Sequence, residues 1–285
     1  MKYLYSLLLV FILLFGCNDE GYVPDPLVLI SYTANETGSV ANSTLIIGKY
    51  EVVLVDAQLL KQPAQDVVQM IRNTGKKLTR IFITHSHPDH YLGLAILQDE
   101  FPDVQILATE KVVREINNTA QGTFDALKAM FGDLMADRYI VPQVLNSTEL
   151  LLEGNFLQIL EYSNTESNEI AALYVPSLKA FLSSDLLYND VFLWLVEKRP
   201  NEWIQILDQI ANMDINIIYP GHGLPQGLFL INENKQYITD FIAATQEAGA
   251  NAQTVIDAMK AKYPLYQGNY LLQASAEAYF PKDKE

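Results

Sequence analysis

A chain of 285 residues, 49% of them hydrophobic, is long enough to bury the core of one large domain. Its formal net charge of -15 at pH 7 would repel a phosphate backbone, which argues against nucleic acid as a partner. Because Cys17 is the single cysteine, a disulfide within the chain is excluded.

The first residues have the pattern of a bacterial export signal. A lysine precedes the apolar run 7–15, which is too short to span a bilayer but fits a signal-peptide core. A glycine and Cys17 follow, in a setting that resembles the lipobox of bacterial lipoproteins; the alternative is an ordinary secretory signal with an incidental cysteine. We therefore expect residues 1–16 to be a signal peptide and a lipid on Cys17 to anchor the protein in the bacterial cell envelope, on its periplasmic or extracellular face. Residues 17–26, with two prolines, read as a flexible tether.

The expected domain comprises residues 27–285. Its first half alternates between strands and helices. Short apolar, β-branched runs predict strands at residues 27–30, 43–47, 51–55, 80–84 and 104–107. Proline at a first turn and apolar residues at helical spacing predict a helix from Pro63 to Gly75. Further helices are expected from Leu92, at 109–116 and at 124–134, the last two separated by Asn117 and Asn118.

Strands return in the second half and are followed by helices. The expected strands lie at residues 139–141, 150–152, 156–160, 170–175 and 180–182. The expected helices lie at 201–211, 231–248, and after Gln253 and Tyr270. Strands followed by helices, twice over, predict an α+β fold with two β-sheets packed face to face and helices outside.

Three of the four histidines fall within six positions. His85, His87 and His90 stand together with Asp89 directly after an expected strand, and so on a loop at its carboxyl end. Imidazole nitrogens and carboxylate oxygens suit zinc and its neighbours, whereas solvated or core histidines rarely gather in this way. The fourth, His222, follows another apolar run. The cluster predicts a metal site.

This run is similar to the His-x-His-x-Asp-His signature of the metallo-β-lactamase fold superfamily. Further matching pieces follow in the same order as in that family: Val55-Asp56, Gly93, Ser184-Asp185 where the family has Gly-Asp, and Gly221-His222. The resemblance runs from about residue 27 to about residue 225. It implies a four-layer αββα sandwich with two mixed sheets. It also implies a metal-dependent hydrolase, in which metal-activated water attacks an ester, lactone, thioester, amide or phosphoester of a small molecule.

The resemblance also implies a role for each side chain, around one or two Zn²⁺ ions, with iron or manganese as alternatives. The first metal position takes His85 and His87, the second takes Asp89, His90 and His222, and Asp185 bridges the two. Asp89 would also act catalytically by orienting the attacking water. Asp56 would support the metal loop from behind.

One ligand of the first position departs from the family pattern. Where the family has Gly-His-Thr, this chain has Ser163-Asn164-Thr165. An amide oxygen is a weak ligand for zinc, so Asn164 itself, Glu166 or Glu169 must substitute, or the first ion binds loosely or not at all. The departure leaves an alternative function, a non-catalytic or weakly catalytic ligand-binding lipoprotein with a degraded first position.

The expected partner is a small-molecule substrate, with membrane contact only through the lipid. Tyr188, Trp194 and Trp203 follow Asp185 closely enough to line a cleft, although an aromatic stripe is more often core. The sequence names neither the substrate nor the oligomeric state.

Overall fold

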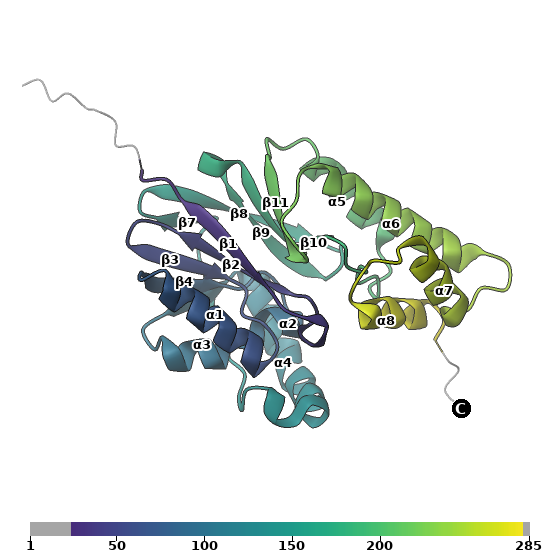
Figure 1. Ribbon diagram of the computed structural model, residues 1–285, viewed down its shortest axis with the longest axis horizontal. Helices are drawn as coiled ribbons and strands as arrows, with labels where there is room; N and C mark the ends of the chain where they lie inside the picture. Colours follow the sequence, from purple (N-terminus) through teal and green to yellow (C-terminus); the bar gives the residue numbers. More distant parts are fainter. Residues whose placement is uncertain (1–23, 282–285) are drawn as a thin grey trace, which may run out of the picture.

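The computed structural model describes residues 24–281. The expected signal peptide, Cys17 and most of the tether lie outside these residues. Two β-sheets pack face to face, and helices cover both outer faces (Figure 1). The predicted α+β fold with two mixed sheets is confirmed. Within the described part of the chain, no helix is long and apolar enough to cross a membrane.

The first sheet has six strands in the order of the chain. They are β1 (Val28–Thr33), β2 (Asn42–Ile47), β3 (Glu51–Val55), β4 (Lys77–Phe82), β5 (Gln105–Ala108) and β6 (Gln143–Val144). The first three strands pair antiparallel, and β3 to β6 pair parallel. The carboxyl ends of the parallel strands meet at one edge of the sheet, which is where functional loops gather in such units.

The second sheet has five strands in the order β11-β10-β9-β8-β7. Their bounds are β7 (Glu149–Leu152), β8 (Asn155–Ser163), β9 (Glu169–Val175), β10 (Ala180–Tyr188) and β11 (Ile217–His222). Strands β7 to β10 pair antiparallel, and β10 pairs parallel with β11.

The alternation of side chains along each strand explains the layers. In β2, Leu45 and Ile47 pack against the helices, while Ile46 between them packs against the other sheet. In β3, Leu54 faces the helices and Val53 the second sheet. Because both faces of these strands are buried, they read as continuous apolar runs rather than alternating ones.

Helices form the two outer layers. The first sheet is covered by α1 (Lys61–Asn73), α2 (Pro88–Tyr91), α3 (Leu94–Glu100) and α4 (Glu110–Phe131). The second is covered by α5 (Pro200–Ile210), α6 (Phe229–Gln246), α7 (Ala252–Lys262) and α8 (Asn269–Tyr279). Short 3-10 turns lie at η1 (Glu36–Gly38), η2 (Gly132–Leu134) and η3 (Pro176–Leu178).

The expected break at Asn117 and Asn118 was wrong, because α4 runs through both residues. The Asn117 side chain donates to the carbonyl of Val113 at 3.0 Å, inside the helix. Ile116 and Ala120 on the same helix are buried against the first sheet. That burial outweighs the few tenths of a kcal/mol by which asparagine disfavours a helix.

Two other expectations differ from the structure. Residues 139–141 are not a strand; Tyr139 packs against Phe124 of α4, with ring centroids 5.6 Å apart. All three residues pack against the core between the first sheet and its helices, which explains their apolar character. The helix expected from Leu92 is divided into α2 and α3, and His90 lies in the short α2.

Candidate metal centre

The histidine cluster lies at the end of the two sheets where β4 and β11 finish. His85 and His87 follow β4, Asp185 lies in β10, and His222 is the last residue of β11. The backbone N–H of Ala171 donates to the carbonyl of Thr84 at 2.8 Å, which ties the second sheet to the metal loop. The sandwich thus brings together residues that are more than a hundred positions apart in the sequence.

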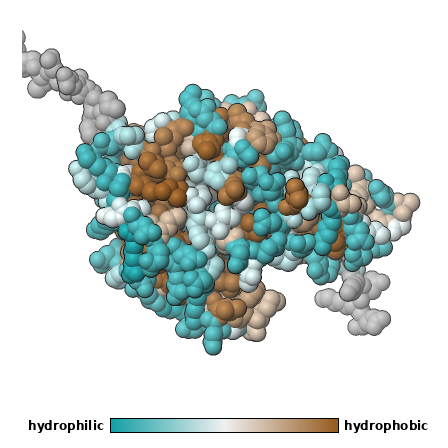
Figure 2. Space-filling view, viewed as in Figure 1, coloured by the Kyte–Doolittle hydropathy of each residue, from teal (hydrophilic) through white to brown (hydrophobic). Residues whose placement is uncertain are grey.

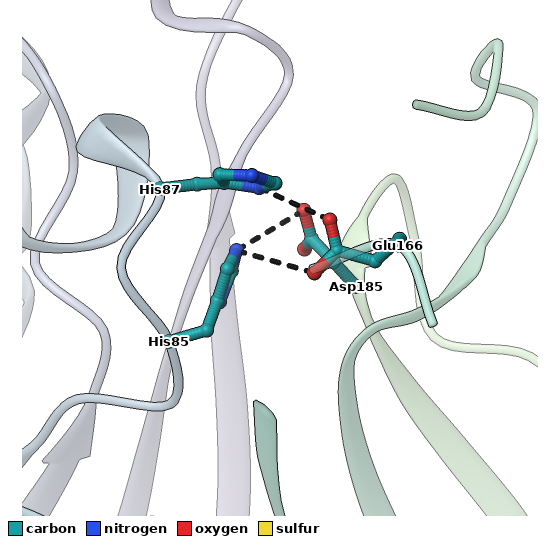
Figure 3. A group of neighbouring side chains, drawn as sticks. All are labelled: His85, His87, Glu166 and Asp185. Carbon is teal, nitrogen blue, oxygen red and sulfur yellow. Dashed lines mark ion pairs between the residues drawn. The ribbon is translucent and has the colours of Figure 1, made fainter. Parts of the chain in front are cut away.

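A first group contains His85, His87, Glu166 and Asp185, whose ligand atoms all lie within 4.8 Å of one another. Figure 3 shows the two imidazoles facing the two carboxylates across a small gap. Nδ1 of His87 lies 3.0 Å from Oε2 of Glu166, and Nε2 of His85 lies 3.7 Å from Oε1 of the same carboxylate. Two histidines and two carboxylates form a donor set suited to a divalent ion.

A second group contains Asp89, His90 and His222, also within 4.8 Å of one another. The two Nε2 atoms of His90 and His222 lie 3.4 Å apart. Asp89 lies 3.9 Å from His90 and 3.8 Å from His222.

Asp185 lies between the two groups. Its Oδ2 atom is 3.0 Å from Nε2 of His222 and 3.5 Å from Nε2 of His85, and its Oδ1 atom is 3.2 Å from Nε2 of His90. The Tyr188 hydroxyl donates to Oδ2 at 2.8 Å and fixes the carboxylate. A side chain on Gly221 would place its Cβ 1.8 Å from Oδ1, so only glycine permits this approach.

Hydrogen bonds behind the histidines orient their rings. Asp56 lies 2.9 Å from Nδ1 of His90 and accepts the backbone N–H of Thr84 at 2.9 Å. Nδ1 of His222 donates to the carbonyl of Ser39 at 2.8 Å. With Nδ1 engaged in this way, each Nε2 is left to face a cation.

Three supporting residues were missed by sequence reasoning. Ser184 lies 2.6 Å from Thr84 and 3.2 Å from Nδ1 of His85, so it holds that ring; its position beside Asp185 was the available signal. For Tyr188 the sequence predicts only a place in the core or in a cleft wall, not a contact with Asp185. Ser39 acts through its backbone, which no sequence pattern reveals.

Glu166 fills the place opposite His85 and His87, and the other two candidate substitutes do not. Asn164 is exposed and lies in a turn at a positive φ of 60°. Glu169 is directed toward Lys111, 3.2 Å away. Glu166, in contrast, is buried.

The buried polar atoms of the first group fit a bound cation. Nε2 of His85, Oε1 of Glu166 and Oδ1 of Asp185 make no hydrogen bond within residues 24–281. Buried polar atoms of this kind are costly without a partner. A divalent cation among them would supply one to all three.

The charges of the site are strongly coupled. Burial opposes protonation of His87, but the Glu166, Asp185 and Asp89 carboxylates outweigh it and raise its pKa to about 9. Burial acts likewise on His90, whose pKa is nevertheless held well above its usual value by Asp185, Asp56 and Asp89. In metal-free protein, protons therefore take the place of a cation, and metal binding must release them.

The aromatic residues after Asp185 divide between core and site. Trp203 and Tyr188 are buried, as an aromatic stripe usually is. Trp194 is half-buried, and its ring centroid lies 5.7 Å from that of His87. Of these three, Trp194 and Tyr188 adjoin the ligand groups.

Comparison with known proteins identifies the family. Residues 37–222 match the sequence model of the metallo-beta-lactamase superfamily, which is more than half of the chain. The chain belongs to the metallo-beta-lactamase superfamily. In that superfamily the His/Asp/Glu cluster described above implies a divalent metal ion.

Individual relatives are similar over part of the chain or in fold alone. A hydroxyacylglutathione hydrolase of Haemophilus ducreyi is 37% identical over 73 residues, 25% of this chain and 28% of that protein. The uncharacterised protein YobT of Bacillus subtilis is 33% identical over 70 residues, 25% of this chain and 30% of that protein. The match thus spans less than a third of either relative. A metallo-beta-lactamase family protein of Thermus thermophilus has a TM-score of 0.61 at 20% identity, over 89% of this chain and 91% of that one.

Proposed function

We propose that this protein is a zinc-dependent hydrolase of a small molecule, acting on an ester, lactone, thioester, amide or phosphoester. The observation that carries the proposal is the buried Glu166 carboxylate, which faces His85 and His87 where a third histidine is missing. The first metal position therefore retains three donors besides Asp185. A partial match to a hydroxyacylglutathione hydrolase adds support for hydrolysis.

The side chains fit this chemistry. His85, His87 and Glu166 would hold one ion, Asp89, His90 and His222 a second, and Asp185 would reach both. A divalent ion bound there lowers the pKa of water toward neutrality and polarises a carbonyl or phosphoryl oxygen. Asp89 lines an open cavity, so its carboxylate is placed to orient a water and accept its proton.

A ligand-binding protein with a degraded metal site is the alternative. Asn164 was the feature that favoured it. Because Asn164 is exposed and Glu166 provides an anionic donor in its place, the structure offers the alternative no specific support.

Metal analysis and turnover of the purified protein test the proposal together. We expect stoichiometric divalent metal and hydrolysis of at least one generic ester, thioester, amide or phosphoester, both lost in His90→Ala and Asp185→Ala. Zinc reconstitution of the chelator-treated protein should restore turnover. Stoichiometric metal without turnover of any of these substrates would favour the binding protein instead.

We propose, in addition, that a lipid on Cys17 anchors the protein in the bacterial cell envelope. Pro24 and Leu27, at the start of the described chain, line a groove with Leu151 and Phe156. These two side chains are 50% and 54% exposed. An apolar patch beside the first described residues suits a surface that rests on lipid. Fatty-acid labelling and recovery in the membrane fraction should both be lost in Cys17→Ala. Export of the unchanged protein without any fatty-acid label would contradict the anchor.

A further inference from the structure

A cavity of about 550 Å³ adjoins the metal centre and is not explained by metal binding. Asp89 of the second ligand group lies in its wall, beside Pro88. The other walls of the cavity come from the end of α4, from α8, and from Glu36, Thr37, Ser39 and Leu59. A volume of this size suits a small organic group.

The walls of the cavity are mainly apolar. Leu127, Met130 and Phe131 come from α4, and Tyr270 and Ala274 come from α8. Met130 is 73% exposed and Tyr270 44% exposed, so both remain available to cover a ligand. Figure 2 shows brown side chains at the lower edge of the molecule, over the end of α4.

The wall formed by α8 is fixed to the body of the protein. The Ser275 hydroxyl accepts from the N–H of Leu195 at 2.8 Å, and the N–H of Gly268 donates to Glu36 at 3.0 Å. Leu272 is fully buried in the core between the second sheet and its helices. This helix lies beyond the residues that match the family, so the cavity is shaped by a part of the chain that the family match does not cover.

The only charged side chains that line the cavity are acidic. They are Glu36, Asp89 and Glu277, and within residues 24–281 no lysine, arginine or histidine lines it. The nearby Lys128 of α4 is bound to Asp137 at 3.0 Å and to two backbone carbonyls. An anionic group in the cavity would therefore meet the carboxylates of Glu36 and Glu277, with no lysine, arginine or histidine in the walls to offset the repulsion.

We propose that this cavity receives a neutral, apolar arm of the substrate, an alkyl or aryl group next to the bond that is cleaved, and disfavours an anionic arm. The inference rests on the proposed hydrolase and names its substrate class. An arm lying between α4 and α8 would place the adjoining carbonyl beside Asp89.

A series of 4-nitrophenyl esters tests the preference on the metal-loaded full chain. We expect kcat/KM to rise about two- to fourfold per methylene from acetate through butyrate to hexanoate, because each methylene enters an apolar wall. The mono-4-nitrophenyl ester of adipic acid has the same length as the hexanoate but ends in a carboxylate, and should be at least about tenfold slower. Equal rates across the series, or a faster adipate ester, would overturn the inference.

Calorimetric binding separates this inference from the proposed function. Hexanamide and the monoamide of adipic acid differ in the same terminal carboxylate and need no turnover. If no ester is cleaved, the hydrolase proposal fails, but hexanamide should still bind at least about tenfold more tightly than the anionic amide. Equal binding, or binding of neither amide, contradicts the cavity assignment.

Charge reversal provides a matched pair of variants. Glu277 in the cavity and Asp257 outside it each accept a hydrogen bond at 2.9 Å from a glutamine four residues earlier. Glu277→Lys should raise the adipate-to-hexanoate rate ratio about fivefold or more, while Asp257→Lys leaves it unchanged. Equal changes in the two variants would show a general charge effect and count against the cavity.

A second pair tests the apolar wall. Met130→Gln should reduce the preference for hexanoate over acetate, whereas Leu265→Gln, at an exposed leucine that does not line the cavity, should retain it. An unchanged preference in Met130→Gln would exclude the end of α4 from the substrate site.

Discussion

Nδ1 of His87 lies 3.0 Å from Oε2 of Glu166, a residue two positions beyond the asparagine that stands where the family has its third histidine. The exchange replaces a neutral imidazole by a carboxylate. With Glu166 as the ligand that we propose, the first metal position would gain a negative charge and keep its number of donors. This contact is the basis of the first prediction.

Glu166→Gln should weaken the first metal position about tenfold or more, because an amide replaces an anionic donor without changing the shape of the side chain. Metal content measured after dialysis should fall by one ion per chain. Glu169→Gln is the matched control, because Glu169 pairs with Lys111 and should leave the metal content unchanged. Full metal content in Glu166→Gln would mean that Glu166 is not a ligand.

Asp56→Asn should weaken metal binding about 10- to 100-fold, the usual effect of removing a partner behind a histidine ligand. Asp56 contacts both His90 and Thr84, so its loss frees the ring and the metal loop. Competition with a chromophoric chelator measures the change. Asp66→Asn is the control, since Asp66 accepts the Tyr32 hydroxyl at 2.9 Å outside the ligand groups.

The stability of the metal-free protein and its affinity for metal should change with pH in opposite directions. In the metal-free protein the pKa of His87 is raised to about 9, mainly by Glu166 acting against burial, from an ordinary value of 6.5. The contribution of protonated His87 to the free energy of unfolding is therefore complete below pH 6.5, and it is lost as the pH rises through 9. Metal binding requires the same proton to leave, so metal affinity should rise across this window.

Thermal unfolding from pH 6.5 to pH 9, with chelator and with excess zinc, measures both trends. We expect Tm to fall with pH when chelator is present, and the gap between the two curves to widen. A metal-free Tm that stays constant or rises across the window would show that Glu166 does not hold a proton on His87.

Gly221→Ala should abolish metal binding at the second position. The added Cβ would lie 1.8 Å from Oδ1 of Asp185, so the carboxylate must move away from His90 and His222. Gly227→Ala is the control, because its Cβ would meet only Phe229, at an ordinary 3.6 Å. Metal titration and circular dichroism of both variants separate a local loss of binding from general unfolding; equal metal affinity in the two would contradict the predicted clash.

The layers of the fold were open to sequence reasoning because hydrophobic periodicity is a local property. Strands such as β3 and helices such as α1 were found from it nearly to the residue. Two of the failures, the break in α4 and the strand at 139–141, share one cause. Local propensity predicts a break at Asn117 and Asn118 and a strand at 139–141. Tertiary packing against the first sheet and α4 decides the conformation of both segments instead.

The sequence by itself determined the family, the two-sheet fold class and the histidine run, because a strand followed by four closely spaced ligand residues is readable in one stretch of chain. Only the tertiary structure decided which of Asn164, Glu166 and Glu169 faces His85 and His87. All three lie in or beside one short turn, and the direction of each side chain depends on the backbone of that turn and on burial against the opposite sheet. The cavity between α4 and α8 was likewise invisible in the sequence, because its walls meet only when helices more than a hundred residues apart pack beside the same metal loop.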